Sequence, residues 1–250
     1  MSNNRTLVVT AWNNKLYEEY AHIFEETYNW DLDYIVYNED DDLFDLCPDL
    51  KEFVQAYSGR KVIKDYTKDA VRFSYKVFAY CHAISAYTED YDGIIWIDAD
   101  SRFYKPIDQA WLDKHIIRRD KMITYMGRGK YPSECGFMYF NLHHPDIQQW
   151  VSAMKKMYTA GKLFNLRQQD DSYVFDVVRL RFQRNGIQFY DIGDSDWGHV
   201  QERSILGGVY DHMKGKRKYK KGSYENPLFE GHDEAKRFRW LGKQTERRRV

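Results

Sequence analysis

The chain has 250 residues, of which 30% are charged and 17% aromatic, and its formal net charge is zero. This length suits one large α/β domain, or one domain with an appendage. No apolar run approaches the roughly 18 residues of a membrane span, and the polar N-terminus does not have the pattern of a signal peptide. Three cysteines without Cys-x-x-Cys spacing argue against a disulfide framework and structural zinc. We therefore expect a cytoplasmic protein with reduced thiols.

Strands and helices alternate along the predicted chain. Apolar runs predict strands at 6–12, 33–38, 93–97, 122–126, 136–141 and 187–191. Apolar residues at helical spacing predict helices at 16–28, 68–88, 145–160 and 171–184. Residues 48–65 show no clear pattern, and the acidic run 39–42 indicates an exposed loop. This alternation predicts an α/β fold with a mostly parallel central sheet flanked by helices.

The zero net charge hides a strong asymmetry between the two ends of the chain. Residues 1–100 hold 9 Lys or Arg against 20 Asp or Glu, a net charge of −11. Residues 212–250 hold 13 against 5, a net charge of +8, and mix the cations with tyrosine, phenylalanine and tryptophan. Such a segment suits phosphate groups of a nucleic acid, a diphosphate or an anionic lipid. The alternative is a solvated tail that binds nothing.

Two aspartates follow the most apolar predicted strand, Gly93–Ile97. Strand alternation would place Asp98 and Asp100 on one face, where both carboxylates can approach a hard divalent cation. In open α/β sheets, ligands bind beyond the carboxyl ends of strands. A solvated turn in which the two aspartates cap a helix is the alternative interpretation, since Asp-x-Asp by itself is a common pattern.

A second motif lies near the C-terminus and reads His212-x-x-Gly215-x-x-Lys218. A neutral imidazole can be a metal ligand. Glycine lets the backbone approach a phosphate closely, and lysine supplies a point charge for a diphosphate. An ordinary surface histidine followed by solvated lysines is the simpler interpretation of the same residues.

Together the two motifs resemble those of the metal-dependent glycosyltransferases of the GT-A fold, particularly the retaining family 8 of glycogenins and bacterial lipopolysaccharide galactosyltransferases. The resemblance implies that Asp98, Asp100 and His212 bind Mn²⁺ or Mg²⁺, and that Gly215 and Lys218 hold the diphosphate of a nucleotide sugar. It also implies a GT-A domain over 1–222 and a basic C-terminal extension over 223–250, packed on that domain or trailing from it. Family 8 continues its second motif with Pro-Trp, where this chain has Tyr219-Lys220. A divergent family, for instance a viral one, fits equally well.

The resemblance extends to further donor-binding residues. It implies that the end of the first strand receives the nucleoside, and that a helix before the metal strand turns basic residues toward the nucleotide sugar. Core packing of the first group and an ordinary helix surface for the second are the alternatives. The donor-binding residues implied are Thr10, Ala11, Trp12, Arg72, Lys76 and Ala99.

Two more segments complete the expected active site. By resemblance, Asp170 would hydrogen-bond the donor sugar, and Asp171 would lie on the face of the anomeric carbon opposite the leaving group. The alternative for this pair is a helix N-cap. The segment 132–141 resembles the strand that lines the acceptor pocket, with Glu134 and Gly136 as acceptor-binding residues. A core strand with a glycine bulge would explain it without function.

These residues predict a metal-dependent glycosyltransferase that transfers a sugar from a nucleotide-diphosphate sugar to an acceptor hydroxyl, and the resemblance implies retention of configuration. The basic tail makes a modified DNA base a candidate acceptor, in host cytoplasm if the protein is viral, and a glycan, free or lipid-linked, is the other. Two other classes of protein remain. A nucleotidyltransferase would carry a glycine-rich phosphate loop near the N-terminus, which residues 8–14 do not have. A non-catalytic nucleic-acid-binding protein would leave the aspartate pair unexplained.

Overall fold

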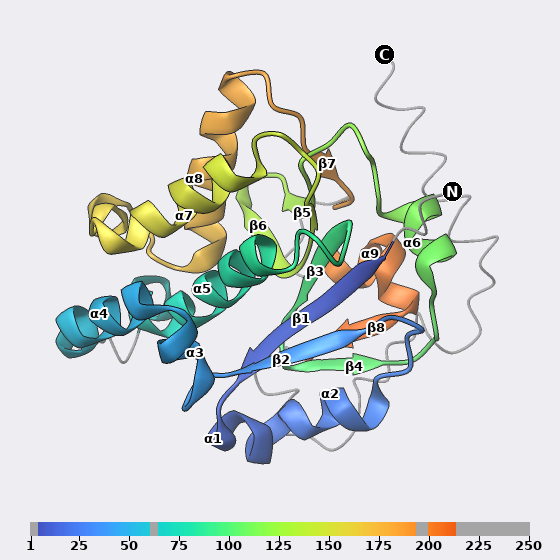
Figure 1. Ribbon diagram of the computed structural model, residues 1–250, viewed down its shortest axis with the longest axis horizontal. Coiled ribbons are helices and arrows are strands. Elements are labelled where there is room, and N and C mark those ends of the chain that lie inside the picture. The colour runs from blue at the N-terminus through green and yellow to red at the C-terminus, as the bar shows by residue number, and fades with distance from the viewer. Residues whose placement is uncertain (1–4, 61–64, 194–199, 214–250) are drawn as a thin grey trace. The chain divides into compact units, whose positions relative to one another are not determined.

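A computed structural model describes residues 5–60, 65–193 and 200–213 of the chain (Figure 1). The strands are β1 (Thr6–Trp12), β2 (Tyr34–Asn38), β3 (Gly93–Ile97), β4 (Ser101–Phe103), β5 (Ile123–Arg128), β6 (Tyr131–Asn141), β7 (Tyr190–Asp191) and β8 (Tyr210–His212). The helices are α1 (Asn14–Leu16), α2 (His22–Thr27), α3 (Asp42–Leu46), α4 (Pro48–Tyr57), α5 (Ala70–Ala86), α6 (Gln109–His115), α7 (Ile147–Thr159), α8 (Asp171–Arg184) and α9 (Val200–Arg203). No described helix has both the length and the apolar character needed to cross a membrane.

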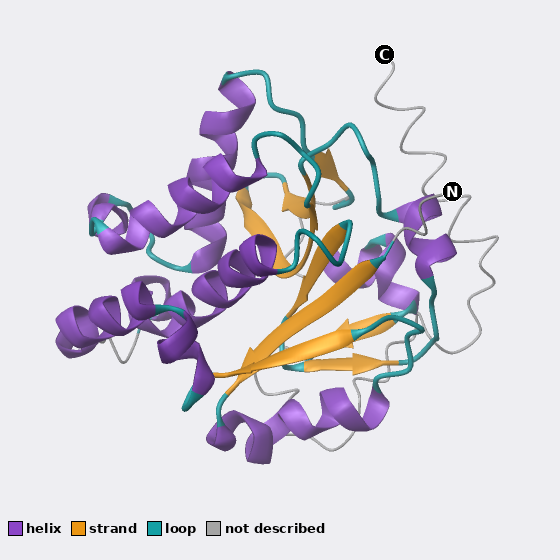
Figure 2. Cartoon of the chain, in the orientation of Figure 1, coloured by secondary structure: helices purple, strands orange, loops and turns teal. Residues whose placement is uncertain are grey.

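A central sheet of six described strands has the order β2-β1-β3-β6-β5-β7. Strands β1, β2 and β3 pair in parallel, β6 runs antiparallel to both of its neighbours, and β7 pairs in parallel with β5. A separate antiparallel pair joins β4 to β8. The predicted α/β fold class, with a mostly parallel central sheet flanked by helices, is thus confirmed (Figure 2).

The core lies on both faces of this sheet. Alternation sends Leu7 and Val9 of β1 to one face, where they pack in a cluster with residues of α4, α5, α7 and α8. Val8 points to the other face and packs with residues of α2, α6 and the β4–β8 pair. Figure 1 shows α4, α5, α7 and α8 gathered on one side, with α2 on the other. Because both faces are covered, β3 consists of buried residues throughout.

Local signals explain where the helices begin. Asp69, Asp108 and Asp170 are the N-caps of α5, α6 and α8, and each carboxylate accepts a backbone N–H bond from the first turn. Pro48 opens α4, where its missing N–H costs no intrahelical bond. Between α1 and α2 the chain widens into a π-helical turn, Tyr17–Ala21.

Most predicted elements match observed ones, and the differences are as follows. Residues 48–57 form α4, and Asp42 of the expected acidic loop begins α3. Helices α6 and α9 and strands β4 and β8 have no counterpart among the predicted elements. Strand β6 is longer than expected, whereas the expected strand 187–191 is reduced to β7. The expected domain boundary at 222/223 and the basic extension lie outside the described residues.

Candidate active site

Two segments far apart in the sequence meet beyond the carboxyl end of β3. Asp98 directly follows β3, and its backbone N–H continues the ladder by donating to the Gly136 carbonyl at 3.1 Å. The chain then bends through Asp100 into β4, where Ser101 pairs in register with His212 of β8. This short antiparallel pair therefore carries His212 back to the two aspartates, more than 100 residues earlier in the chain.

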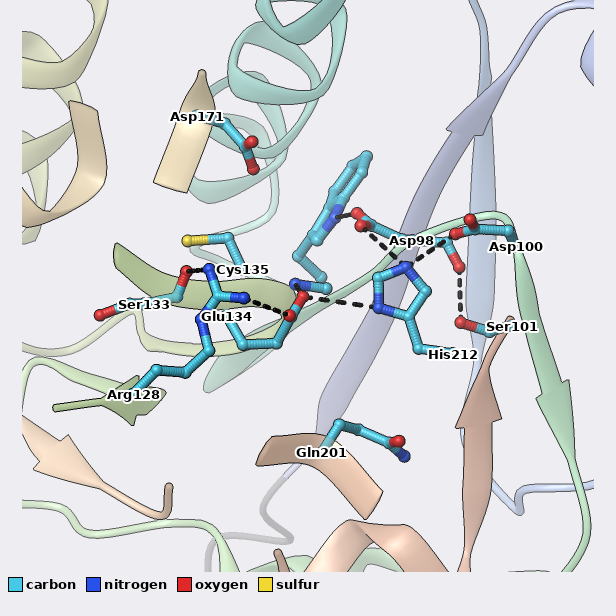
Figure 3. Close-up of polar contacts among 12 residues, drawn as sticks. Asp98, Asp100, Ser101, Arg128, Ser133, Glu134, Cys135, Asp171, Gln201 and His212 are labelled. Atoms are coloured by element: carbon cyan, nitrogen blue, oxygen red, sulfur yellow. Dashed lines mark hydrogen bonds and ion pairs between the residues drawn. The ribbon is translucent and has the colours of Figure 1, made fainter. Parts of the chain in front are cut away.

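The three side chains form a compact cluster (Figure 3). His212 Nε2 lies 2.9 Å from Asp100 Oδ1 and 3.5 Å from Asp98 Oδ2. One candidate ligand atom from each residue lies within 4.8 Å of the other two. Asp100 and His212 are buried, and the side chain of Asp98 is 24% exposed, so the cluster opens to solvent on the Asp98 side.

This donor set fits a divalent cation. Two carboxylates and one imidazole suit Mn²⁺, and the carboxylates also suit Mg²⁺. Three protein ligands leave coordination positions for oxygens of a substrate. Neither aspartate caps a helix, since β4 follows them, so the capping interpretation of the pair is wrong.

The two oxygens of Asp98 have different surroundings. Oδ1 accepts a hydrogen bond from the Trp96 indole Nε1 at 2.7 Å and lies 2.7 Å from the Lys76 Nζ. Oδ2 is the oxygen that faces His212. Asp98 can therefore offer Oδ2 to an ion while Oδ1 keeps the carboxylate oriented.

Lys76 links the metal cluster to the start of α8. Its Nζ lies 2.8 Å from Asp171 Oδ2 and donates to the Cys135 carbonyl at 2.7 Å, in addition to its pairing with Asp98. Burial lowers the pKa of Lys76, but the charges of Asp171 and Asp98 outweigh burial, so the pKa lies above its ordinary value. The single Nζ of a positively charged lysine thus bridges the carboxylates of Asp98 and Asp171.

Asp170 caps α8 beside Asp171, as the simpler interpretation of this pair expects. Its Oδ1 accepts a hydrogen bond from Tyr173 N at 3.1 Å, and the residue is buried. Burial, followed by the charge of Asp171, raises the pKa of Asp170 to about 6. Two adjacent carboxylates, one ion-paired and one with a raised pKa, repel each other. Such unfavourable pairs of like charges are common in active sites.

We expect Asp170→Asn to be more stable than the wild type above pH 6, because asparagine keeps the cap and removes the buried charge. Between the ordinary pKa of 3.8 and the folded value of about 6, the folded protein binds more protons than the unfolded chain, so stability falls as pH rises. The difference should reach about 3 kcal/mol at pH 8 and vanish below pH 4. Urea unfolding across this range measures it.

The matched control is Asp108→Asn, the same change at the exposed N-cap of α6. It should leave the pH dependence of unfolding as in the wild type. An Asp170→Asn protein that unfolds with the wild-type pH profile would contradict the assignment of this dependence to Asp170.

Gly136 lies against the metal cluster rather than in open space. A Cβ at this position would lie 2.4 Å from His212 Nδ1 and 3.0 Å from Glu134 Oε1. Both neighbours are buried and cannot withdraw far. The absence of a side chain at Gly136 therefore makes room for the His212 imidazole.

We expect Gly136→Ala to lower the affinity for Mn²⁺ by about 10-fold or more, because the new methyl group displaces a ligand. Overpacking should also cost about 1–3 kcal/mol of folding free energy. Isothermal titration with Mn²⁺ and urea unfolding measure the two effects. Gly59→Ala is the control, since nothing lies within 4 Å of a Cβ there. Unchanged Mn²⁺ affinity in Gly136→Ala would show that His212 is not a ligand.

The other expected donor-binding residues are divided between the core and the surface. Thr10, Ala11 and Trp12 end β1 and are buried. Trp12 packs on Tyr17 and Phe24 with ring centroids 6.0 and 5.7 Å apart, as the core-packing interpretation expects. Ala99 is buried on the same face as Trp12. The role of these residues in receiving the nucleoside stays a prediction.

Arg72 lies on the exposed surface of α5, one turn before Lys76. Residues four apart share one face of a helix, so Arg72 lies on the face of α5 from which Lys76 reaches Asp98. Gly215 and Lys218 of the second motif lie outside the described residues.

Three residues near the cluster were not singled out from the sequence. Trp96 orients Asp98, and the i, i+2 alternation of a strand could have indicated their contact. Tyr20 lies in the π-helical turn, and burial, followed by the charge of Asp100, raises its pKa above the ordinary value. Arg128 of β5 pairs with Glu134 at 3.6 Å, and no sequence pattern predicts that pairing.

No protein-family model matches this chain, and no curated protein does. The solved structures to which the chain is similar include three glycosyltransferases. A glycosyltransferase involved in glycosylation of the major capsid of PBCV-1 is 12% identical, with a TM-score of 0.47 over 86% of this chain and 98% of that one. Mouse xyloside xylosyltransferase 1 is 12% identical, with a TM-score of 0.44 over 76% and 85%. GlyE of Streptococcus pneumoniae TIGR4 is 13% identical, with a TM-score of 0.41 over 76% and 46%.

Proposed function

We propose that this protein is a metal-dependent glycosyltransferase that transfers a sugar from a nucleotide-diphosphate sugar to an acceptor hydroxyl. The observation that carries the proposal is the cluster of Asp98, Asp100 and His212 beyond the end of β3. Lys76 and Asp171 extend it into one continuous polar site. A purely structural role would not require three potential metal ligands at the edge of the sheet where α/β proteins bind their ligands.

The reaction needs positive charge at the leaving group. Cleavage between the anomeric carbon and the diphosphate leaves negative charge on the phosphate oxygens, and a bound divalent cation supplies Lewis-acid stabilisation there. Asp98 and Asp100 would hold the cation through oxygen, and His212 through Nε2. In the motif that follows His212, Lys218 would add a second positive charge, and Gly215 would let the backbone approach the diphosphate.

Asp171 and Lys76 would position the donor sugar. Their ion pair of 2.8 Å orients the Asp171 carboxylate at the start of α8. A carboxylate on the face of the anomeric carbon opposite the leaving group stabilises positive charge that develops on that carbon. The resemblance to family 8 is what favours transfer with retention of configuration. Asp170 would contribute a hydrogen bond to the sugar.

For the acceptor, we propose only a class of molecule. A glycan and a modified DNA base both present a hydroxyl group, and the cationic residues of 212–250 favour an acceptor that carries phosphate. A steep loss of acceptor affinity as the salt concentration rises would support DNA. An affinity that is insensitive to salt would support a neutral glycan.

Incubation with Mn²⁺ and a panel of nucleotide sugars tests the proposed reaction. We expect release of nucleoside diphosphate from one donor, dependent on the metal and stimulated by acceptor. Proton NMR of the anomeric signal in the product then gives retention or inversion. Release of pyrophosphate would indicate a nucleotidyltransferase instead, and no turnover with any donor in the presence of DNA or glycan acceptors would contradict the proposal.

A further inference from the structure

A third carboxylate lies behind His212, on the side of the ring away from the metal cluster. Glu134 of β6 is buried, and its Oε1 lies 3.5 Å from His212 Nδ1. The other ring nitrogen, Nε2, faces Asp100 and Asp98. Figure 3 shows the imidazole between Glu134 on one side and the two aspartates on the other.

Glu134 is held in place by its own strand and by β5. Its Oε1 accepts a hydrogen bond from Gly136 N at 3.0 Å, and its Oε2 lies 3.6 Å from the Arg128 Nη1. Arg128 is in turn anchored through its guanidinium to the carbonyls of Pro132 and Ser133. A buried carboxylate with these partners has little freedom to turn elsewhere.

The imidazole is equally constrained. Gly136 leaves no atom between the ring and β6, and a Cβ there would overlap Nδ1. Ser101 of β4 pairs with His212 along the backbone, which fixes the position of its Cα. The ring therefore has Glu134 at Nδ1 and the two aspartates at Nε2, and it cannot be flipped without breaking both arrangements.

We propose that Glu134 is a positioning residue for the metal site: it keeps the proton of His212 on Nδ1, so that the lone pair of Nε2 points to the cation. This inference rests on the metal site of the proposed function and on no other part of it. Metal-binding histidines commonly donate their second ring N–H to a carboxylate, which fixes the tautomer and the ring orientation. Glu134 thereby supports the metal site from within β6, and the acceptor-binding role that the resemblance implies for it stays a prediction.

Mn²⁺ binding by Glu134→Gln tests the proposal, since glutamine keeps the shape and removes the charge. We expect the dissociation constant for Mn²⁺, measured by isothermal titration, to rise about 10- to 100-fold. Glu52→Gln, the same change on the exposed surface of α4, should leave it unchanged. A Glu134→Gln protein that binds Mn²⁺ as tightly as the wild type would overturn the proposal.

The tautomer itself can be read in the wild-type protein, so the test does not depend on the variant folding. With diamagnetic Mg²⁺ bound, ¹⁵N NMR of the histidine rings should show His212 protonated at Nδ1 and unprotonated at Nε2. His212→Asn identifies the signal by its loss. A wild-type ring protonated at Nε2 in the metal-bound protein would overturn the proposal.

These outcomes separate the inference from the proposed function. If the wild type binds Mn²⁺ but transfers no sugar, the proposed reaction fails while the role of Glu134 stands. If sugar transfer is metal-dependent and Glu134→Gln binds Mn²⁺ normally, only the role of Glu134 fails. If the wild type binds neither Mn²⁺ nor Mg²⁺, both fail together.

Discussion

Asp100→Ala and His212→Ala should each reduce kcat/KM for metal-dependent sugar transfer by about 1000-fold or more. Each change removes one of three ligands, and the cation provides the charge that stabilises the leaving diphosphate. Because the lost interaction is strongest in the transition state, added Mn²⁺ should restore little of the rate. Nucleoside diphosphate release, measured at several Mn²⁺ concentrations, determines the loss for each variant.

Glu52→Ala is the matched control for these two substitutions, since it removes an exposed carboxylate from α4. It should keep wild-type activity and Mn²⁺ affinity. Circular dichroism should show all three variants folded. If Asp100→Ala or His212→Ala retained wild-type turnover at the same Mn²⁺ concentration, the residue would not be a ligand.

Lys76→Met should lower the free energy of unfolding by about 3–5 kcal/mol in metal-free protein. Lys76 supplies the cation that lies within 2.8 Å of both Asp98 and Asp171, and its removal leaves two carboxylates without it in a largely buried site. A cation bound beside Asp98 replaces part of the lost charge. We therefore expect Mn²⁺ to recover more stability in Lys76→Met than it adds to the wild type. Urea unfolding with and without Mn²⁺ measures both effects.

Lys155→Met provides the comparison, since Lys155 pairs with Asp49 at 2.7 Å in a more exposed place. That variant should lose at most about 1 kcal/mol, because surface ion pairs contribute little. Equal stability of the two variants, or a Lys76→Met protein that is insensitive to Mn²⁺, would contradict the linking role of Lys76.

The sequence predicted the parts of the fold and site that depend on local patterns. The apolar run of β3 and the aspartates that follow it could be recognised from composition and alternation alone. His212 was recognised from its spacing to Gly215 and Lys218 and from the resemblance to a family, since one histidine carries no local signal. Strand β8 also has no local signal, because its three residues form a strand only through their pairing with β4.

The features of the site that the sequence does not indicate depend on contacts between distant segments of the chain. Gly136 is expected from the resemblance to bind the acceptor, and only the pairing of β8 with β4 shows that the His212 imidazole lies against it. The contact of Glu134 with His212 joins β6 to β8 and has no signature in either strand. Lys76 was selected for its charge, and the packing of α5 near the start of α8 brought it to both Asp98 and Asp171.

A crystal grown with Mn²⁺ and an unreactive analogue of the donor would test the metal site most directly, by anomalous scattering at the manganese edge. We expect one strong peak per chain among Asp98 Oδ2, Asp100 and His212 Nε2, with diphosphate oxygens completing the coordination. Manganese bound elsewhere, with the diphosphate away from these three residues, would contradict the central claim that this cluster is the catalytic metal centre.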